Sequence, residues 1–177
     1  MIEVRTVHTA ELGSATLAAA RDLLEQAFDG RWSPHDWDHC LGGVHALAWD
    51  GGTLVGHGSV VQRRLLCGGR AVRTGYVEGV GVRADRRGRG HGAAVMAALE
   101  RVIRGGYELG ALSASDAAVG FYTARGWLRW QGPTWSLTPY GVVRTPDDDG
   151  AVFVLPVTVT PDPASPLTCD WRDGDVW

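Results

Sequence analysis

Long apolar segments are missing from this chain of 177 residues. No stretch approaches the roughly 20 consecutive apolar residues that a membrane-spanning helix requires, and the sequence opens directly on a strand-like segment, Ile2 to Thr9. Basic residues are not in excess either, with 17 Lys and Arg against 20 Asp and Glu. We therefore expect a cytoplasmic protein that has neither a membrane nor a nucleic-acid partner.

Cysteine is scarce, and its spacing argues against two kinds of site. Cys40, Cys67 and Cys169 are odd in number and form neither a metal-binding nor a redox pair, so reduced thiols are the simplest interpretation. His35 and His39 lie four residues apart beside two aspartates, but no convincing third ligand follows nearby. We expect no metal there and interpret the segment as a polar edge of a substrate cleft.

The acidic residues are unevenly distributed along the chain. From Gly141 onward there are seven aspartates and two arginines, whereas the preceding part holds 13 acidic and 15 basic residues. The front of the chain would suit an anionic cofactor and the acidic tail a cationic substrate. The alternative is that aspartates gather in the tail because polar loops favour them.

The first half of the chain predicts two helices followed by an antiparallel meander. Ser14 and Ser33 are candidate helix N-caps, and Pro34 follows the second at a favoured first position. These helices should extend to about Phe28 and to Cys40. Gly-Gly pairs then separate the predicted strands, which are 44–50, 53–66 and 72–82.

The second half predicts a βαβ unit and an irregular tail. A helix from about Gly90 to Arg104 separates two strands, of which the second covers 107–115, so these strands should be parallel neighbours. Ser115 or Asp116 should cap a helix that ends at Gly126. The remainder indicates short strands and long loops. We expect a single domain over residues 1–177, in which the acidic segment 141–177 completes the substrate site.

The segment from Val72 to Gly92 joins a strand to a helix through a basic, glycine-rich turn. Glycines let the backbone approach a ligand closely, and the unpaired amides of a first helical turn favour an anion such as a pyrophosphate. Glu78 lies in the strand just upstream and is a candidate base. A nucleotide-triphosphate loop is excluded because no Gly-Lys-Ser/Thr ending follows. A dinucleotide fold is disfavoured by Arg86 and Arg87 and by the antiparallel front. A solvent-exposed Arg/Gly turn is the remaining alternative.

This turn resembles the acyl-CoA site of the GCN5-related N-acetyltransferases (GNAT). Their Gln/Arg-x-x-Gly-x-Gly/Ala signature is met at every fixed position from Arg87 to Gly92, and FYTARGW, from Phe121 to Trp127, is similar to the second family motif. The resemblance implies an α/β fold (an α+β mixed sheet) with an antiparallel N-terminal meander, a central βαβ unit and helices on both faces. It also implies acetyl-CoA as co-substrate. The implied CoA contacts are Val80, Gly81, Val82, Arg87, Gly88, Arg89, Gly90, His91 and Gly92.

Further segments resemble one family within this superfamily, the aminoglycoside 2'-N-acetyltransferases. They are LGGVHALAW (41–49), GYVEGVGV (75–82), LGALSAS (109–115), TPDDDG (145–150) and CDWRDGDVW (169–177). The likeness covers nearly the whole chain and implies acetylation of the 2'-amino group of aminoglycoside antibiotics, hence resistance, by a homodimer. Because Trp171 and Trp177 stand among aspartates, we expect the final segment to be docked rather than frayed.

The resemblance also implies a direct ternary-complex mechanism with no covalent enzyme intermediate. Glu78 would remove the amine proton through a water, and Tyr122 would protonate the departing thiolate. A strand bulge near Gly79 and Val80 would aim a backbone N–H at the oxyanion. The alternatives are a Glu78 that merely pairs with a residue such as Arg73, and a Tyr122 that serves only core packing.

Carboxylates should select a polycationic, hydroxyl-rich substrate. One departure from the family pattern is Arg31, which stands where an acidic residue is expected and brings a like charge near such a substrate. Two alternatives therefore remain: an acetyltransferase for another cationic amine (a polyamine, peptide or cell-wall amino sugar), and an acyl-CoA-binding sensor. The substrate contacts that the resemblance implies are Asp36, Glu78, Gly79, Ser113, Asp147, Asp148, Asp175 and Trp177 with its terminal carboxylate.

Overall fold

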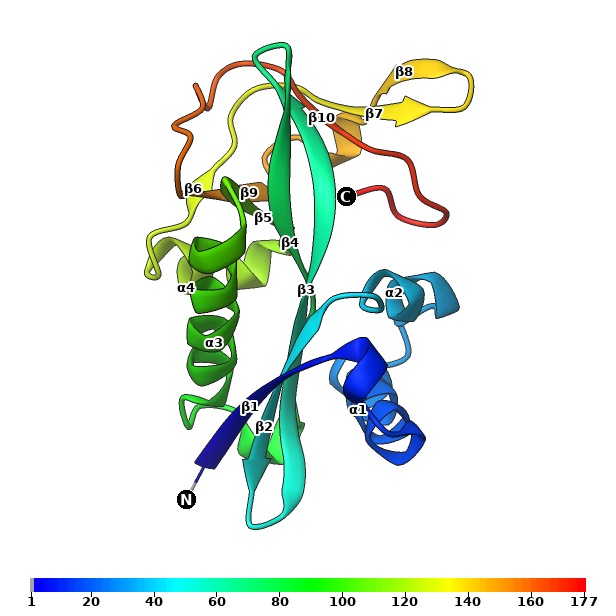
Figure 1. Ribbon diagram of the computed structural model, residues 1–177, viewed down its shortest axis with the longest axis vertical. Coiled ribbons are helices and arrows are strands. Elements are labelled where there is room, and N and C mark those ends of the chain that lie inside the picture. Colours follow the sequence, from blue (N-terminus) through cyan, green and yellow to red (C-terminus); the bar gives the residue numbers. More distant parts are fainter. Residues whose placement is uncertain (1) are drawn as a thin grey trace. The chain divides into compact units, whose positions relative to one another are not determined.

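The structure is a computed structural model that describes residues 2–177 (Figure 1). The chain forms two compact units. The first holds the described residues up to Val61 together with Val77–Val102, and the second holds Gln62–Tyr76 and Ile103–Trp177. Strands β3 (Thr53–Cys67) and β4 (Arg70–Val82) therefore each contribute residues to both units. The single domain expected from the sequence stays a prediction.

The first unit is built on an antiparallel meander. Strand β1 (Ile2–His8) pairs with β2 (Val44–Asp50), and β2 pairs with β3, both in antiparallel fashion. The turn between β2 and β3 uses Gly51 and Gly52 with φ of 57° and 79°, the left-handed values that a tight hairpin of matching twist requires. Its helices are α1 (Ser14–Ala27), α2 (Pro34–His39) and most of α3 (His91–Gly106), with one-turn helices at Thr9–Glu11 and Ala84–Arg86.

Helices cover both faces of the first unit's strands. A side chain at Gly58 on β3 would lie 2.9 Å from Val95 and from Leu99, both on α3. A side chain at Gly81 on β4 would instead lie 2.8 Å from Leu24 on α1. Small residues thus let a helix approach the strands closely on each side. The expected mixed fold with helices on both faces is confirmed.

Two helix starts test the predicted N-caps in this unit. Ser33 caps α2 as expected, because its side chain accepts from the Asp36 backbone N–H while the Asp36 carboxylate accepts from the Ser33 N–H. The prediction for Ser14 was wrong by one residue. Gly13 is the N-cap, since its carbonyl accepts the first helical bonds from Thr16 and Leu17, and Ser14 is already helical.

The second unit carries the βαβ return and the acidic tail. Strand β5 (Leu109–Ser113) runs parallel to β4, with Thr74 opposite Leu109, which confirms the predicted parallel pair. The expected helix after β5 is shorter than predicted: a turn at Asp116–Ala118 leads into α4 (Val119–Thr123), without a side-chain cap from Ser115. The remaining strands of this unit are β6 (Leu128–Arg129), β7 (Thr134–Thr138), β8 (Gly141–Arg144), β9 (Val152–Pro156) and β10 (Leu167–Cys169). Neighbouring strands are hydrogen-bonded in the order β6-β9-β5-β4-β3-β10-β7-β8.

Candidate active site

The glycine-rich loop before α3 is shaped to receive an anion. Gly88 and Gly90 have φ of 73° and 82°, a left-handed backbone that side chains adopt only with strain. The first helical bond of α3 runs from the Ala94 N–H to the Gly90 carbonyl, at 3.0 Å, so the amides of the preceding turn have no partner within the helix. Such amides, at the positive end of a helix of this length, favour a phosphate group.

Side chains of this loop fit the same ligand. The Arg87 guanidinium donates to the backbone carbonyls of Ala27 at 2.9 Å and Val82 at 3.3 Å, which ties the loop to α1 and β4. Arg89 is exposed and supplies positive charge. The His91 ring is buried, yet neither of its nitrogens has a hydrogen-bond partner among the described residues. A buried imidazole that forms no hydrogen bonds destabilises the folded protein, so a ligand that hydrogen-bonds to the His91 ring would fit this position.

Strand β4 departs from regular geometry next to Glu78. Gly79 has a φ of 56° within the strand, as in a bulge whose first residue is a left-handed glycine. No side chain fits there, because a Cβ would lie 2.6 Å from the Cys40 Sγ. The Gly79 carbonyl accepts from the His57 Nδ1 at 2.8 Å. Glu78 is half-buried, and its own backbone carbonyl accepts from the Ser59 hydroxyl at 3.5 Å.

Tyr122 sits in an aromatic cluster of the second unit. Its ring packs edge-on against Phe121 and Trp127 and tilted against Phe153, with centroid separations of 5.1, 6.3 and 6.0 Å. Burial raises the pKa of Tyr122 to about 12, opposed in part by the nearby Arg125. The phenol therefore holds its proton at neutral pH, as a proton donor must.

The C-terminal segment is docked, as expected. Trp177 is buried and donates its Nε1–H to the Thr145 hydroxyl at 2.9 Å, while its backbone N–H donates to the Asp175 carboxylate at 3.3 Å. Arg172 donates to the Asp175 carbonyl at 2.8 Å. In Figure 1 this red segment loops outward and then turns back before the chain end labelled C. The bond from Trp177 attaches the tail to Thr145, the residue that precedes the one-turn helix Pro146–Asp148.

Three consecutive aspartates in the second unit have different environments. Burial and the nearby Asp175 raise the pKa of Asp148 to about 6, whereas Asp147 is exposed. Asp149 instead forms an ion pair with Arg144 at 2.6 Å and accepts from the Thr134 N–H and hydroxyl, which holds its pKa well below the usual range. Asp148 therefore lies close to a second carboxylate, that of Asp175, whereas Asp149 is used in bonds to Arg144 and Thr134.

Two predicted substrate contacts have simpler surroundings. The Asp36 carboxylate, in the first unit, accepts from the Ser33 N–H at 2.7 Å, so one of its oxygens caps its own helix. Ser113, in the second unit, is exposed at the end of β5. The exposed Arg31 follows the left-handed pair Asp29 and Gly30.

Comparison with known proteins places these motifs in a family. A model of the GNAT acetyltransferase domain matches residues 8–129. The chain is 55% identical over 177 residues to the aminoglycoside 2'-N-acetyltransferase of Mycolicibacterium fortuitum, covering 98% of this chain and 91% of that protein. The chain belongs to the GNAT acetyltransferase family. Both the loop before α3 and the segment around Tyr122 lie within the matched residues, whereas the acidic tail lies beyond them.

Solved structures agree on the fold of this GNAT acetyltransferase. Escherichia coli ElaA is similar with a TM-score of 0.64 at 18% identity, over 87% of this chain and 99% of that one. A GNAT family acetyltransferase from Brucella melitensis, solved in complex with acetyl-CoA, has a TM-score of 0.61 at 16% identity over 94% of each chain. At these identities the likeness shows the fold alone.

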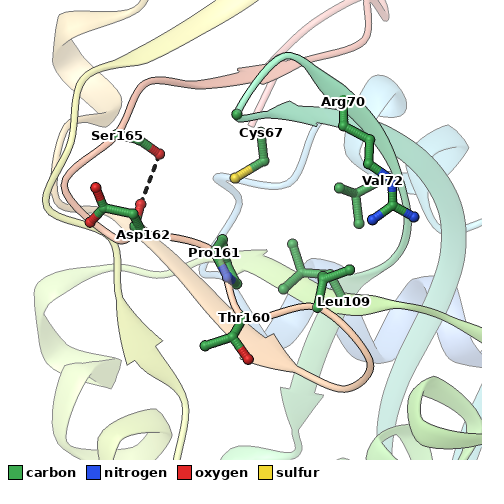
Figure 2. Close-up of a pocket in the computed structure, with 10 residues that line it drawn as sticks. Cys67, Arg70, Val72, Leu109, Thr160, Pro161, Asp162 and Ser165 are labelled. Carbon is green, nitrogen blue, oxygen red and sulfur yellow. Dashed lines mark hydrogen bonds between the residues drawn. The ribbon is translucent and has the colours of Figure 1, made fainter.

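The acetyltransferase also has a separate hollow in its second unit. It encloses about 310 Å³ and is lined by residues that include Cys67, Arg70, Leu109 and Asp162, but by none of the predicted site residues (Figure 2). Within residues 2–177, no three metal-ligating side chains converge, and no helix is long and apolar enough to span a membrane. All three cysteines are free thiols.

Proposed function

We propose that this GNAT acetyltransferase transfers the acetyl group of acetyl-CoA to the 2'-amino group of aminoglycosides. The observation that carries the proposal is the acidic tail of the second unit, where Trp177 is bonded to Thr145 and Asp148 lies near Asp175. A docked cluster of carboxylates suits a polycation. The 55% identity to a protein of that name extends over this tail as well.

The first unit has the features that acetyl-CoA binding requires. A pyrophosphate suits the left-handed glycines, the amides at the start of α3 that have no partner within the helix, Arg89, and His91, whose ring nitrogens have no partner within residues 2–177. Val80 to Val82 present strand backbone for a pantetheine chain. When bound, acetyl-CoA supplies the acetyl group as an activated thioester.

Each catalytic role in the proposal belongs to a named residue. Glu78 accepts the proton that the 2'-ammonium must lose before its nitrogen can attack, through a water. The bulge at Gly79 offers a backbone N–H to the carbonyl oxygen as negative charge develops on it. Tyr122 gives its phenol proton to the departing sulfur. One proton is thus taken from the amine and one returned to the thiol, and solvent restores both side chains.

The pKa of Asp148 predicts a pH-dependent affinity. Because this pKa is raised to about 6, the carboxylate is charged at neutral pH and loses its charge as the pH falls through 6. As the pH falls, the aminoglycoside affinity of the wild type should therefore drop by about fivefold more than that of a variant that lacks the Asp148 carboxylate. Calorimetric titration of the wild type and of Asp148→Asn from about pH 7.5 to about pH 5 checks this.

The Asp148→Asn variant is its own control, since the drug's amines gain charge over the same range in both titrations. The ratio of the two affinities should approach one at the acidic end. A ratio that stays constant across the range would contradict a substrate contact by Asp148.

The raised pKa of Asp148 also predicts a difference in stability. Because the ionised carboxylate is disfavoured in the folded protein, Asp148→Asn should unfold less readily than wild type at neutral pH. The difference should vanish below about pH 4, where the carboxyl group is protonated in the folded and in the unfolded protein.

The docked tryptophan should serve the drug site rather than the CoA site. Trp177→Ala removes the ring and its bond to Thr145, releases the Asp175 segment and should weaken aminoglycoside binding about tenfold or more. CoA affinity should change less than about twofold. Trp177→Phe keeps the packing without the N–H and should lie between wild type and Trp177→Ala. An equal loss for both ligands would make the tail a purely structural element.

Turnover with matched drugs tests the proposed function. CoA release should be rapid with gentamicin or tobramycin, which carry a 2'-amine, and absent with kanamycin A or amikacin, which carry a 2'-hydroxyl. Equal rates with both groups, or none with either, would contradict the assignment to the 2'-amine.

A second candidate is acetylation of another cationic amine, such as a polyamine, peptide or cell-wall amino sugar. The exposed cation Arg31 favours it, because a like charge opposes a polycationic drug. Specificity constants across these amines and tobramycin separate the two candidates. The acyl-CoA sensor is distinguished by the absence of turnover with every amine.

Two further properties belong to the proposal. We propose a cytoplasmic location, with which the three reduced cysteines agree. We also propose a homodimer, on the strength of the family resemblance. Light scattering coupled to size-exclusion chromatography measures the oligomeric state directly.

A further inference from the structure

Two histidines lie in the interior of the first unit next to the proposed base. His45 on β2 and His57 on β3 are fully buried, with no exposed surface. Such residues are seldom retained in a strand core without a partner for each ring nitrogen. Here all four nitrogens have one, and the partners form a continuous line across the strands.

The line begins after β1 and ends at Gly79, the left-handed glycine of β4. The Thr9 hydroxyl lies 2.7 Å from the His45 Nε2, and the His45 Nδ1 lies 2.9 Å from the His57 Nε2. The His57 Nδ1 lies 2.8 Å from the Gly79 carbonyl oxygen. At the other end, the Gly42 N–H donates to the Thr9 hydroxyl at 3.0 Å.

For two neutral rings, the chemistry of these groups allows one arrangement of hydrogens along the line. A carbonyl oxygen only accepts, so the proton of His57 must be on Nδ1 and its Nε2 must accept from His45. His45 then carries its proton on Nδ1 as well, and its Nε2 accepts the Thr9 hydroxyl proton at 2.7 Å, in competition with the Gly43 carbonyl at 3.2 Å. Both rings are neutral, because burial lowers the pKa of His45 and of His57 to about 4. The direction of every bond is thus fixed by the Gly79 carbonyl.

We propose that His45 and His57 are positioning residues, which hold the left-handed backbone of Gly79 and thereby aim the Glu78 carboxylate and the bulge N–H at the reacting groups. This inference rests on the proposed function, since it gives Glu78 its task. Glycine adopts this left-handed backbone without steric strain but is also free to adopt many others, and the bond from His57 to its carbonyl favours the one seen here. The Trp37 ring packs at a tilt against both imidazoles, with ring-centroid separations of 6.5 Å to His45 and 6.2 Å to His57.

Two substitutions at His57 separate positioning from packing. His57→Leu keeps an apolar volume but removes the donor to Gly79, and we expect kcat to fall by about 10- to 100-fold because a small displacement of catalytic groups has an effect of this size. The KM for acetyl-CoA should change less than about twofold. His57→Asn can place an amide N–H near the position of Nδ1 and should recover most of the lost kcat.

The controls make each outcome decisive. Leu23→Ala, a buried truncation on α1, reports what destabilisation alone does to kcat when all variants are assayed well below their melting temperatures. A kcat of His57→Leu no lower than that of Leu23→Ala would overturn the inference. If Glu78→Gln were as active as wild type, the proposed function of Glu78 would fail instead, so the two failures are distinguishable.

A spectroscopic measurement tests the bonded line without any activity. In ¹⁵N-histidine NMR of the whole protein, both buried imidazoles should be Nδ1–H tautomers and should not titrate between about pH 5.5 and about pH 8. His57→Leu should shift the His45 signals. An Nε2–H tautomer at His57 would remove its bond to the Gly79 carbonyl and overturn the inference.

Discussion

Glu78→Gln is expected to lower kcat by about 10²- to 10⁴-fold, the usual contribution of a general base. The amide keeps the shape of the half-buried side chain in β4 but cannot accept the ammonium proton. Acetyl-CoA affinity should stay within about twofold of wild type, because the loop from Arg87 to Gly92, the proposed CoA site, is unaltered. Steady-state kinetics and isothermal titration measure the two effects on the same preparations.

A matched change elsewhere in the first unit controls for the loss of a charge. Glu25→Gln removes a carboxylate on α1 that pairs with Arg21 at 2.9 Å and is well exposed. Its kcat should equal that of wild type within about twofold. Full activity of Glu78→Gln would show that another group removes the proton.

Gly79→Ala is expected to destabilise the protein by about 2 to 4 kcal/mol. The left-handed backbone at φ 56° costs any residue with a Cβ about 1–2 kcal/mol. In addition, the new Cβ would lie 2.6 Å from the Cys40 Sγ, and overpacking of this kind costs about 1–3 kcal/mol. Urea denaturation measures the loss, and the folded fraction should also have a lowered kcat because the proposed oxyanion donor is a backbone N–H at this position.

Two variants divide this effect into its causes. Cys40→Ala in the Gly79→Ala background removes the sulfur, the nearest of three crowded atoms, and should recover most of the steric part, leaving the strain. Gly105→Ala is the matched control, since that helical glycine has ordinary φ and nothing within 4 Å of an added Cβ, and it should be neutral or slightly stabilising. A Gly79→Ala protein as stable as wild type would mean that the backbone of β4 relaxes at no cost.

Local rules explain why so much of the fold could be predicted. The Gly-Gly turns, the Ser33-Pro34 helix start and the strand–helix–strand order depend on residues close in sequence, and each was confirmed. The helix start at Ser14 was wrong because glycine and serine both precede helices, and only the bonds to the Gly13 carbonyl distinguish them.

The site was predicted in its motifs but not in its supporting contacts. His45 and His57 stand in apolar strands, and the bond to the Gly79 carbonyl, 22 residues from His57, depends on strand register that no local pattern gives. Residues 147 to 149 are all aspartates and cannot be told apart in the sequence, yet Asp149 forms an ion pair with Arg144 while Asp148 lies near Asp175. A histidine pair in neighbouring apolar strands was the signal that could have been followed.

The position of the acetyl group in the product tests the central proposal most directly. Tobramycin, acetyl-CoA and the enzyme should give a monoacetylated drug whose two-dimensional NMR spectrum correlates the new acetyl carbonyl with the proton on carbon 2'. Glu78→Gln under the same conditions should give almost none. An acetyl group on any other nitrogen, or no acetylated drug while another amine is consumed, would contradict the account.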